Sequence, residues 1–150
     1  MDRAVMSLRE VTAETVRTIC RLTVAPDQER FVAPNAVSIA EAHFTPEAWF
    51  RAIYADETPV GFVMLERYPE RHEYGLWRFM IAAPFQRRGY GRRALELVVE
   101  DVQAADPAAT ELMTSWVPGD GSPEGFYTRF GFEPTGEIEE GELVGRLRLR

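Results

Sequence analysis

Apolar and polar positions alternate with a period of two along several short segments of this chain, a pattern typical of strands that bury one face. Segment 142–150 shows it most clearly, because leucines alternate there with arginines. The stretch 73–82 is instead almost continuously apolar, which indicates a strand covered on both faces. We predict strands at residues 4–11, 49–56, 60–68, 73–82, 110–117, 132–139 and 142–150.

A period near 3.6 indicates helices, and it is clearest after residue 89. There Ala94, Val98 and Val102 form one apolar stripe, and Pro107 follows the end of the segment. We predict helices at residues 12–24, 38–44, 89–106 and 122–130. This order of elements is typical of a mixed α/β sheet in a single domain over residues 1–150, and not of a uniform βαβ series.

Composition excludes several classes of function. A net charge of −7 and a pI of about 4.9 argue against nucleic acid, because phosphate binding needs a basic face. All 17 basic residues are arginine, which excludes a lysine Schiff base and a P-loop lysine. His43 and His72 have no further ligands at metal-binding spacing, so we expect no metal. Without a signal-like or membrane-spanning apolar run, we expect a cytoplasmic protein with no membrane partner.

The joint between the strand at 73–82 and the helix at 89–106 has the most distinctive chemistry. Its sequence, QRRGYGRRA, contains Gly89 and Gly91, which would let a phosphate approach the backbone closely. The first turn of a helix has unpaired N–H groups and the positive end of the helix dipole. Four arginines in the same turn are unfavourable for an isolated helix, so we predict a multiply charged anion here, such as a pyrophosphate.

Two other interpretations of this joint stay open. The run from Gly89 to Ala94 matches the dinucleotide-binding pattern G-x-G-x-x-A, and Glu111 follows about 20 residues after it. That fold normally places its glycine loop after the first strand, whereas this loop lies past the middle of the chain. Alternatively, the glycines only form a turn and the arginines are solvated.

At these residues the chain resembles the GNAT superfamily, the Gcn5-related N-acetyltransferases. The family's central motif, Q/R-x-x-G-x-G/A, reads here Gln86-Arg87-Arg88-Gly89-Tyr90-Gly91. A second segment, VPGDGSPEGFYTRFGF (117–132), is similar to the family's region between the fifth strand and the last helix. The resemblance covers essentially the whole chain. It implies a GNAT-like mixed sheet of about seven strands with about four helices, in which the fourth and fifth strands splay into a cleft.

The resemblance implies acetyl-CoA as the donor, a small-molecule amine as the acceptor and a homodimer as an assembly to test. It places the pantetheine arm of the donor against backbone groups of Met80, Ile81 and Ala82. Asp120 stands where many relatives have Asn, and would either contact CoA or cap the following helix. The pyrophosphate would lie against the loop residues Gln86, Arg87, Arg88, Gly89, Tyr90, Gly91 and Arg92.

Three residues are candidates for catalysis under this resemblance. Tyr127 matches the position that protonates the departing thiolate in many members, a role that a phenol near the sulfur can perform. Its alternative role is that of a core aromatic. Glu66, at the end of the third predicted strand, and Glu73, at the start of the fourth, are candidates for the general base. Neither has motif support, and surface statistics favour ordinary solvated carboxylates for both.

The acceptor is less defined than the donor. Segments LWRFMI and 31–44 look like the diamine and spermidine/spermine acetyltransferase branch. Glu29 and Glu41 would form an acidic wall that suits a polyamine, or they are ordinary surface carboxylates. An aminoglycoside, an amino acid or a protein N-terminus stays open as the acceptor, as does a non-catalytic CoA-binding module.

Overall fold

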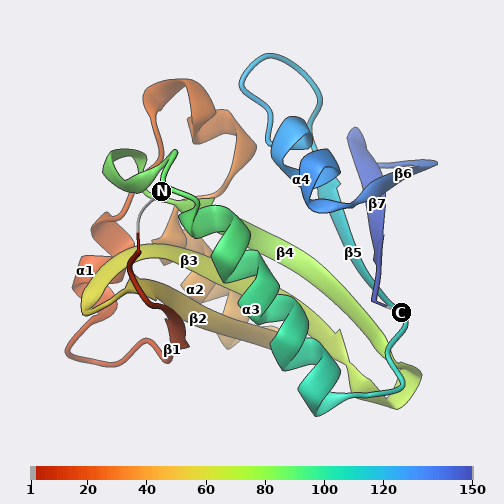
Figure 1. Ribbon diagram of the computed structural model, residues 1–150, viewed down its shortest axis with the longest axis horizontal. Coiled ribbons are helices and arrows are strands. Elements are labelled where there is room, and N and C mark those ends of the chain that lie inside the picture. Colours follow the sequence, from red (N-terminus) through yellow and green to blue (C-terminus); the bar gives the residue numbers. More distant parts are fainter. Residues whose placement is uncertain (1–2, 150) are drawn as a thin grey trace.

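The computed structural model describes residues 3–149, which form one seven-stranded sheet in the order β1-β2-β3-β4-β5-β7-β6 (Figure 1). β4 and β5 are parallel, and the other neighbouring pairs are antiparallel. The mixed sheet is therefore confirmed, and each predicted strand overlaps one observed strand. The strands are β1 (Met6–Arg9), β2 (Ala48–Ala55), β3 (Thr58–Tyr68), β4 (Glu73–Ile81), β5 (Glu111–Trp116), β6 (Glu133–Glu139) and β7 (Glu142–Arg148).

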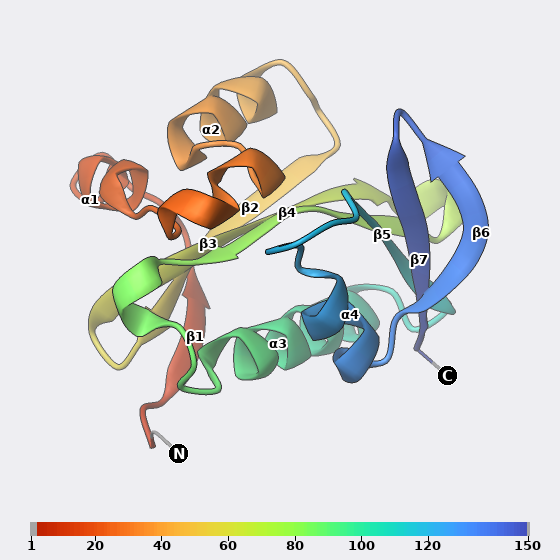
Figure 2. The ribbon, with the colours of Figure 1, turned by 90° about the horizontal axis from the view of Figure 1, so that it is seen from above.

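Helices cover both faces of the sheet. Figure 2 shows α1 and α2 on one face and α3 and α4 on the other, with β3 and β4 between them. The α-helices of residues 3–149 are α1 (Val16–Arg21), α2 (Asn35–His43), α3 (Tyr90–Ala105) and α4 (Glu124–Phe130). The same residues form three short 3₁₀ helices: η1 (Pro26–Phe31) between α1 and α2, η2 (Pro69–Arg71) between β3 and β4, and η3 (Ala83–Phe85) between β4 and α3. The expected set of four helices is confirmed.

The first helix is shorter than its sequence pattern predicts. Thr12 and Thr15 close a turn before it, in which the Thr12 amide donates to the Thr15 hydroxyl oxygen at 2.9 Å. The backbone is extended again at Leu22, and Pro26 then starts η1, which the periodicity does not predict. η1 lies beside the loop before α4, where Arg30 Nη2 donates to the Asp120 carbonyl at 3.2 Å.

Each face of the sheet has its own hydrophobic core. On β3, Val63 and Leu65 pack in the core beneath α3 and α4, whereas Phe62 and Met64 pack in the core beneath α1 and α2. All four side chains are completely buried. β4 likewise contributes side chains to both cores, which explains the near-continuous apolar run at 73–82, because a strand covered on both faces needs apolar residues at odd and even positions.

The parallel pair β4–β5 is held together over only a short length. Its paired residues are Gly75 with Met113 and Leu76 with Thr114. Directly after them, β4 contains one residue more than β3: Trp77 is the residue left without a partner opposite β3. Such a bulge bends a strand and increases its twist. β4 therefore turns away from β5, and the two strands diverge beyond this point (Figure 1).

Candidate active site

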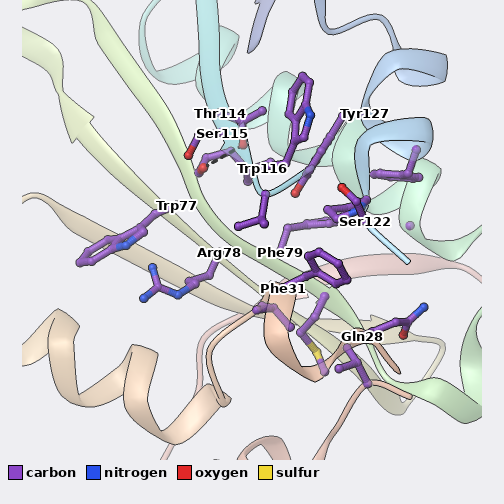
Figure 3. Close-up of a pocket in the computed structure, with 18 of the residues that line it drawn as sticks. Gln28, Phe31, Trp77, Arg78, Phe79, Thr114, Ser115, Trp116, Ser122 and Tyr127 are labelled. Atoms are coloured by element: carbon purple, nitrogen blue, oxygen red, sulfur yellow. Dashed lines mark hydrogen bonds between the residues drawn. The ribbon is translucent and has the colours of Figure 1, made fainter. Parts of the chain in front are cut away.

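An open cleft of about 1400 Å³ starts where β4 and β5 separate. Its walls come from η1, β4, the loop before α3, the end of β5, α4 and the β6–β7 hairpin. Figure 3 shows the side chains that η1, β4, β5 and α4 contribute. Typical small-ligand pockets measure about 300–1,000 Å³, so this cleft has room for two reactants in contact. It joins the predicted anion site to the β6–β7 hairpin.

The backbone of β4 offers hydrogen-bonding groups to this cleft. The Ala82 amide donates to the Val60 carbonyl of β3 at 2.8 Å, so Ala82 faces β3. Backbone groups of successive residues in a strand point alternately to its two neighbours, so Met80 also faces β3. Phe79 and Ile81 therefore face the gap. Of the three residues expected to hold pantetheine, Ile81 has this orientation, and Phe79 is a further candidate that the sequence did not indicate.

The side chain of Gln86 holds the loop in place. Its Nε2 donates to the Ile81 carbonyl at 2.8 Å and to Gln28 Oε1 at 2.9 Å. Gln28 Nε2 donates back to Gln86 Oε1 at 3.2 Å, which ties η1 to the loop. Gln86 lines the cleft, but these contacts occupy its amide group. The geometry favours a positioning role for Gln86 over direct contact with a ligand.

The loop before α3 presents backbone to the cleft. Arg87 and Gly89 both have positive φ angles, of 64° and 83°. A Cβ atom added to Gly89 would meet no atom within 4 Å, so the surface above this residue is open. Arg87, Gly89, Gly91 and Arg92 all line the cleft at the N-terminal end of α3. Unpaired amides, the helix dipole and guanidinium groups therefore converge on one open surface that suits an anion.

Three other expected contact residues hold the structure around this surface. Arg88 Nη2 donates to the Pro84 carbonyl at 3.3 Å, and the Tyr90 side chain is buried in the core. Asp120 lies on the rim, where its carbonyl oxygen accepts a hydrogen bond from Arg30 Nη2 at 3.2 Å. Neither Arg88 nor Tyr90 lines the cleft, and the burial of Tyr90 directs its side chain away from a ligand there.

Tyr127, on α4, places a phenol beside the point where the strands separate. Its ring stacks on Trp116 at a centroid distance of 5.7 Å and meets Phe132 edge-on at 5.5 Å. Figure 3 shows the hydroxyl directed into the cleft. Burial raises the pKa of the phenol well above its ordinary value, against a smaller hydrogen-bonding effect of Thr114 that lowers it. The hydroxyl therefore keeps its proton at neutral pH and can act as a proton donor.

The two candidate bases differ in position. Glu66 lines the cleft, and its Oε2 accepts a hydrogen bond from the Tyr68 hydroxyl at 2.8 Å. Glu73 is exposed and pairs with Arg71 at 2.9 Å in the turn between β3 and β4. The structure thus places Glu66 at the cleft, while Glu73 forms a surface ion pair outside it.

The expected acidic wall contains a cation. Glu29 is exposed on η1 and lines the cleft, as does Glu41 of α2. However, Glu41 Oε1 accepts a hydrogen bond from Arg78 Nη2 at 2.9 Å. Arg78 lies in the same wall, so the charge of Glu41 is compensated before any ligand binds.

Comparison with known families then assigns the chain. A sequence model of the acetyltransferase (GNAT) family matches residues 16–132. The chain belongs to the GNAT family of acetyltransferases. No curated protein sequence matches it significantly.

Solved structures have the same fold as this GNAT family member. A GNAT-family structure from Desulfovibrio desulfuricans has 19% identity and a TM-score of 0.75, over 97% of this chain and 100% of its own. An acetyltransferase from Thermus thermophilus has 18% identity and a TM-score of 0.74, over 99% of each chain. The PaiA N-acetyltransferase from Thermoplasma acidophilum, solved with coenzyme A, has 14% identity and a TM-score of 0.71, over 96% and 99%. At these identities the likeness concerns the fold.

The cleft of this GNAT domain includes residues that the sequence did not single out. Arg78 lines the cleft, yet its place in an apolar run indicates only a buried strand. The β6–β7 hairpin adds four carboxylates to the opposite end of the cleft. A run of glutamates in a turn has no signal that distinguishes a solvated hairpin from a cleft wall. The added residues are Glu137, Glu139, Glu140 and Glu142.

Two structural features decide whether a domain can span a membrane with helices or hold a metal ion: long apolar helices and clusters of ligand side chains. None of the helices within residues 3–149 combines the length and apolarity needed to cross a membrane. Over the same residues, no group of three or more His, Cys, Asp or Glu side chains is arranged to hold a metal ion.

Proposed function

We propose that this protein transfers the acetyl group of acetyl-CoA to the primary amine of a small molecule. The observation that carries the proposal is the distribution of charge along one cleft. Arg87 and Arg92 lie at the end beside α3, and glutamates of the β6–β7 hairpin lie at the other end. An anionic donor and a cationic acceptor can thus enter from opposite ends and meet where β4 and β5 separate.

The residues of the donor end fit coenzyme A. The open surface above Gly89 leaves space for phosphate oxygens against the backbone, which a Cβ atom would fill. Arg87 and Arg92 can neutralise phosphate charge, and the amides of Phe79 and Ile81 can bind the amide groups of an extended arm. Coenzyme A supplies the acetyl group as a reactive thioester. One solved structure with this fold, from Thermoplasma acidophilum, holds coenzyme A.

Two side chains account for the proton transfers. An ammonium must lose a proton before its nitrogen can attack, and the Glu66 carboxylate lines the cleft where it can accept that proton directly or through water. As the new N–C bond forms, the C–S bond breaks and the sulfur needs a proton, while the nitrogen loses its second proton, which can return to the Tyr127 oxygen through water. The Tyr127 hydroxyl holds one at Oη, and its raised pKa keeps it there until the thiolate forms.

Carboxylates at the other end of the cleft support a class of acceptor. Glu66 and the hairpin glutamates favour a molecule with at least one ammonium group, a class that includes polyamines, amino acids and aminoglycosides. The resemblance to polyamine acetyltransferases places spermidine and spermine in the first panel to test.

Calorimetry and a thiol-release assay test the proposal. We expect acetyl-CoA to bind without added metal, with an affinity that falls as salt rises because arginines meet phosphates. Thiol release should then depend on a primary amine. Binding of NADH or ATP with no response to CoA would contradict the proposal. CoA binding without release across the whole amine panel would identify a non-catalytic module.

A further inference from the structure

The bulge in β4 changes which way two neighbouring side chains point. In a regular strand, Trp77 and Arg78 would lie on opposite faces of the sheet. Because Trp77 is the extra residue of the bulge, both lie on the side of α2. Trp77 packs against the core that contains Phe62 and Met80, and Arg78 bonds to Glu41 of α2. Figure 3 shows the two side chains projecting from β4 in the same direction.

The guanidinium of Arg78 is held in place and still has N–H donors without a partner in the described residues. Its side chain is only 19% exposed, and the centre of its guanidinium lies 5.2 Å from the centroid of the Trp77 ring. A guanidinium has five N–H donors. Among residues 3–149, the bond from Nη2 to Glu41 is the one hydrogen bond that it makes. The group also lines the cleft, so its remaining donors are available to a molecule bound there.

A fixed guanidinium in this position selects for the charge of the acceptor. Its planar fork matches a carboxylate, to which it can donate two parallel hydrogen bonds. A polyamine has only cationic groups, so it has no acceptor for the remaining N–H donors of Arg78. The carboxylates of Glu66 and the hairpin can bind the ammonium of the same acceptor. A doubly charged phosphate fits less well, because those carboxylates would repel it.

We propose that Arg78 binds a carboxylate of the acceptor, so that the amine acetylated here belongs to an amino acid or a similar amino-carboxylate rather than to a polyamine. This rests on the proposed acetyltransferase function and narrows its acceptor class. Glu41 and Trp77 are the positioning residues that hold the guanidinium toward the cleft.

Matched acceptors that differ only in the carboxylate provide the test. Each amino acid is compared with the amine formed by its decarboxylation. Examples of such pairs are ornithine with putrescine and lysine with cadaverine. We expect kcat/KM for the wild-type enzyme to favour the carboxylate-bearing member of the best pair by about 10- to 100-fold, the range of one or two hydrogen bonds to a charged group. Arg78→Gln should lose this preference, mainly through KM.

Two further variants exclude a merely structural effect. Arg78→Lys keeps the charge but loses the fork, so it should keep part of the preference. Arg148→Gln removes an arginine that forms an exposed ion pair with Glu133 on the outer strands. This variant should keep the whole preference for the carboxylate-bearing acceptor. A wild-type preference for the diamines, or equal losses for both members of a pair in Arg78→Gln, would overturn the proposal.

The outcomes distinguish a failure of the proposed role of Arg78 from a failure of the proposed acetyltransferase function. If CoA binds and amines are acetylated without regard to the carboxylate, only the role of Arg78 is wrong. If CoA binds and no amino acid in the panel is acetylated, the role of Arg78 is also wrong. If CoA does not bind at all, the acetyltransferase proposal itself fails.

Discussion

At the scale of single residues, the hydroxyl of Tyr127 bears most directly on the chemistry. In Tyr127→Phe the ring that stacks on Trp116 remains, so packing changes little. We expect single-turnover acetylation to slow by about 10²–10⁴-fold, the usual range for general acid catalysis. The Kd of acetyl-CoA should stay close to that of the wild type. A single-turnover rate within a few-fold of the wild-type rate would make Tyr127 a core aromatic instead.

The pH dependence of the same step gives a second measurement. An ordinary tyrosine loses its proton near pH 10. Burial raises the pKa of Tyr127 above that value, so the proton donor persists through the alkaline range. The wild-type single-turnover rate should therefore show no alkaline decline due to Tyr127 below about pH 10. A decline at lower pH that disappears in the Phe variant would contradict a buried, protonated phenol.

At the scale of elements, the N-terminus of α3 can be tested through its glycine. Gly89→Ala places a methyl group in the open space above the loop, where phosphate oxygens are proposed to approach. We expect the Kd of acetyl-CoA to rise about 10-fold, as one hydrogen bond to a charged group weakens. The left-handed backbone of Gly89 also makes alanine strained there, at a cost of about 1–2 kcal/mol in the free energy of unfolding.

Gly136 provides a matched control for this strain. It also has a positive φ, of 91°, and a Cβ atom added to it would likewise meet no atom within 4 Å, but it lies on β6 away from the loop. Gly136→Ala should lower stability to a similar degree in urea titrations and leave acetyl-CoA binding intact. Equal effects of the two substitutions on binding would argue against a phosphate site at Gly89.

The elements themselves could be predicted well because local pattern determines them. Strands with alternating or continuous apolar residues and the stripe of α3 were each found in the expected order. The predicted ends of elements were less accurate where a side chain forms a hydrogen bond with the backbone in place of the helix, as Thr15 does before α1. The bulge at Trp77 has no sequence signature, because it depends on pairing with β3 and not on β4 alone.

Residues of the site could be predicted only where a local motif indicates them. The glycine loop and Tyr127 lie at the cleft as expected, since each belongs to a short segment with its own signal. The contact of Arg78 with Glu41 joins residues 37 positions apart and could not be foreseen. The amide of Gln86 was expected to face a ligand, but it bonds to Gln28 across 58 positions.

At the scale of the whole molecule, Asp106 holds together the end of the cleft where β4 and β5 stay paired. It follows α3 and accepts hydrogen bonds from the Tyr74 hydroxyl of β4 at 2.8 Å and from the Ala108 amide at 3.1 Å. His72 Nδ1 also lies 2.8 Å from Oδ2 of this carboxylate. The bond with His72, followed by those from Tyr74 and Ala108, lowers the pKa of Asp106 against the opposing effect of burial.

This lowered pKa predicts how stability changes with pH. A carboxyl group with a lower pKa in the folded state stabilises the fold above its unfolded pKa of about 4, and that contribution is lost as the pH falls through the folded value. Asp106→Asn should therefore lower the urea midpoint at pH 7, and the difference from the wild type should shrink towards about pH 3.

An exposed carboxylate on α3 controls for the general loss of charge. Glu100 forms a surface ion pair with Arg93 at 3.1 Å, and such pairs contribute about 0–1 kcal/mol. Glu100→Gln should hardly move the urea midpoint at any of these pH values. If Asp106→Asn and Glu100→Gln gave the same pH profile, the hydrogen bonds of Asp106 would not stabilise the fold.

The extra residue in β4 also means that selection for stability alone would act against the cleft. Without Trp77, Leu76 and Arg78 would follow each other opposite Leu65 and Met64, in an unbroken ladder. The amides of Phe79 and Ile81 could then pair with β5, and the sheet would gain backbone hydrogen bonds where the cleft now lies. Selection for stability without regard to turnover would therefore favour loss of this residue and closure of the sheet. Stability and catalysis compete at this one position.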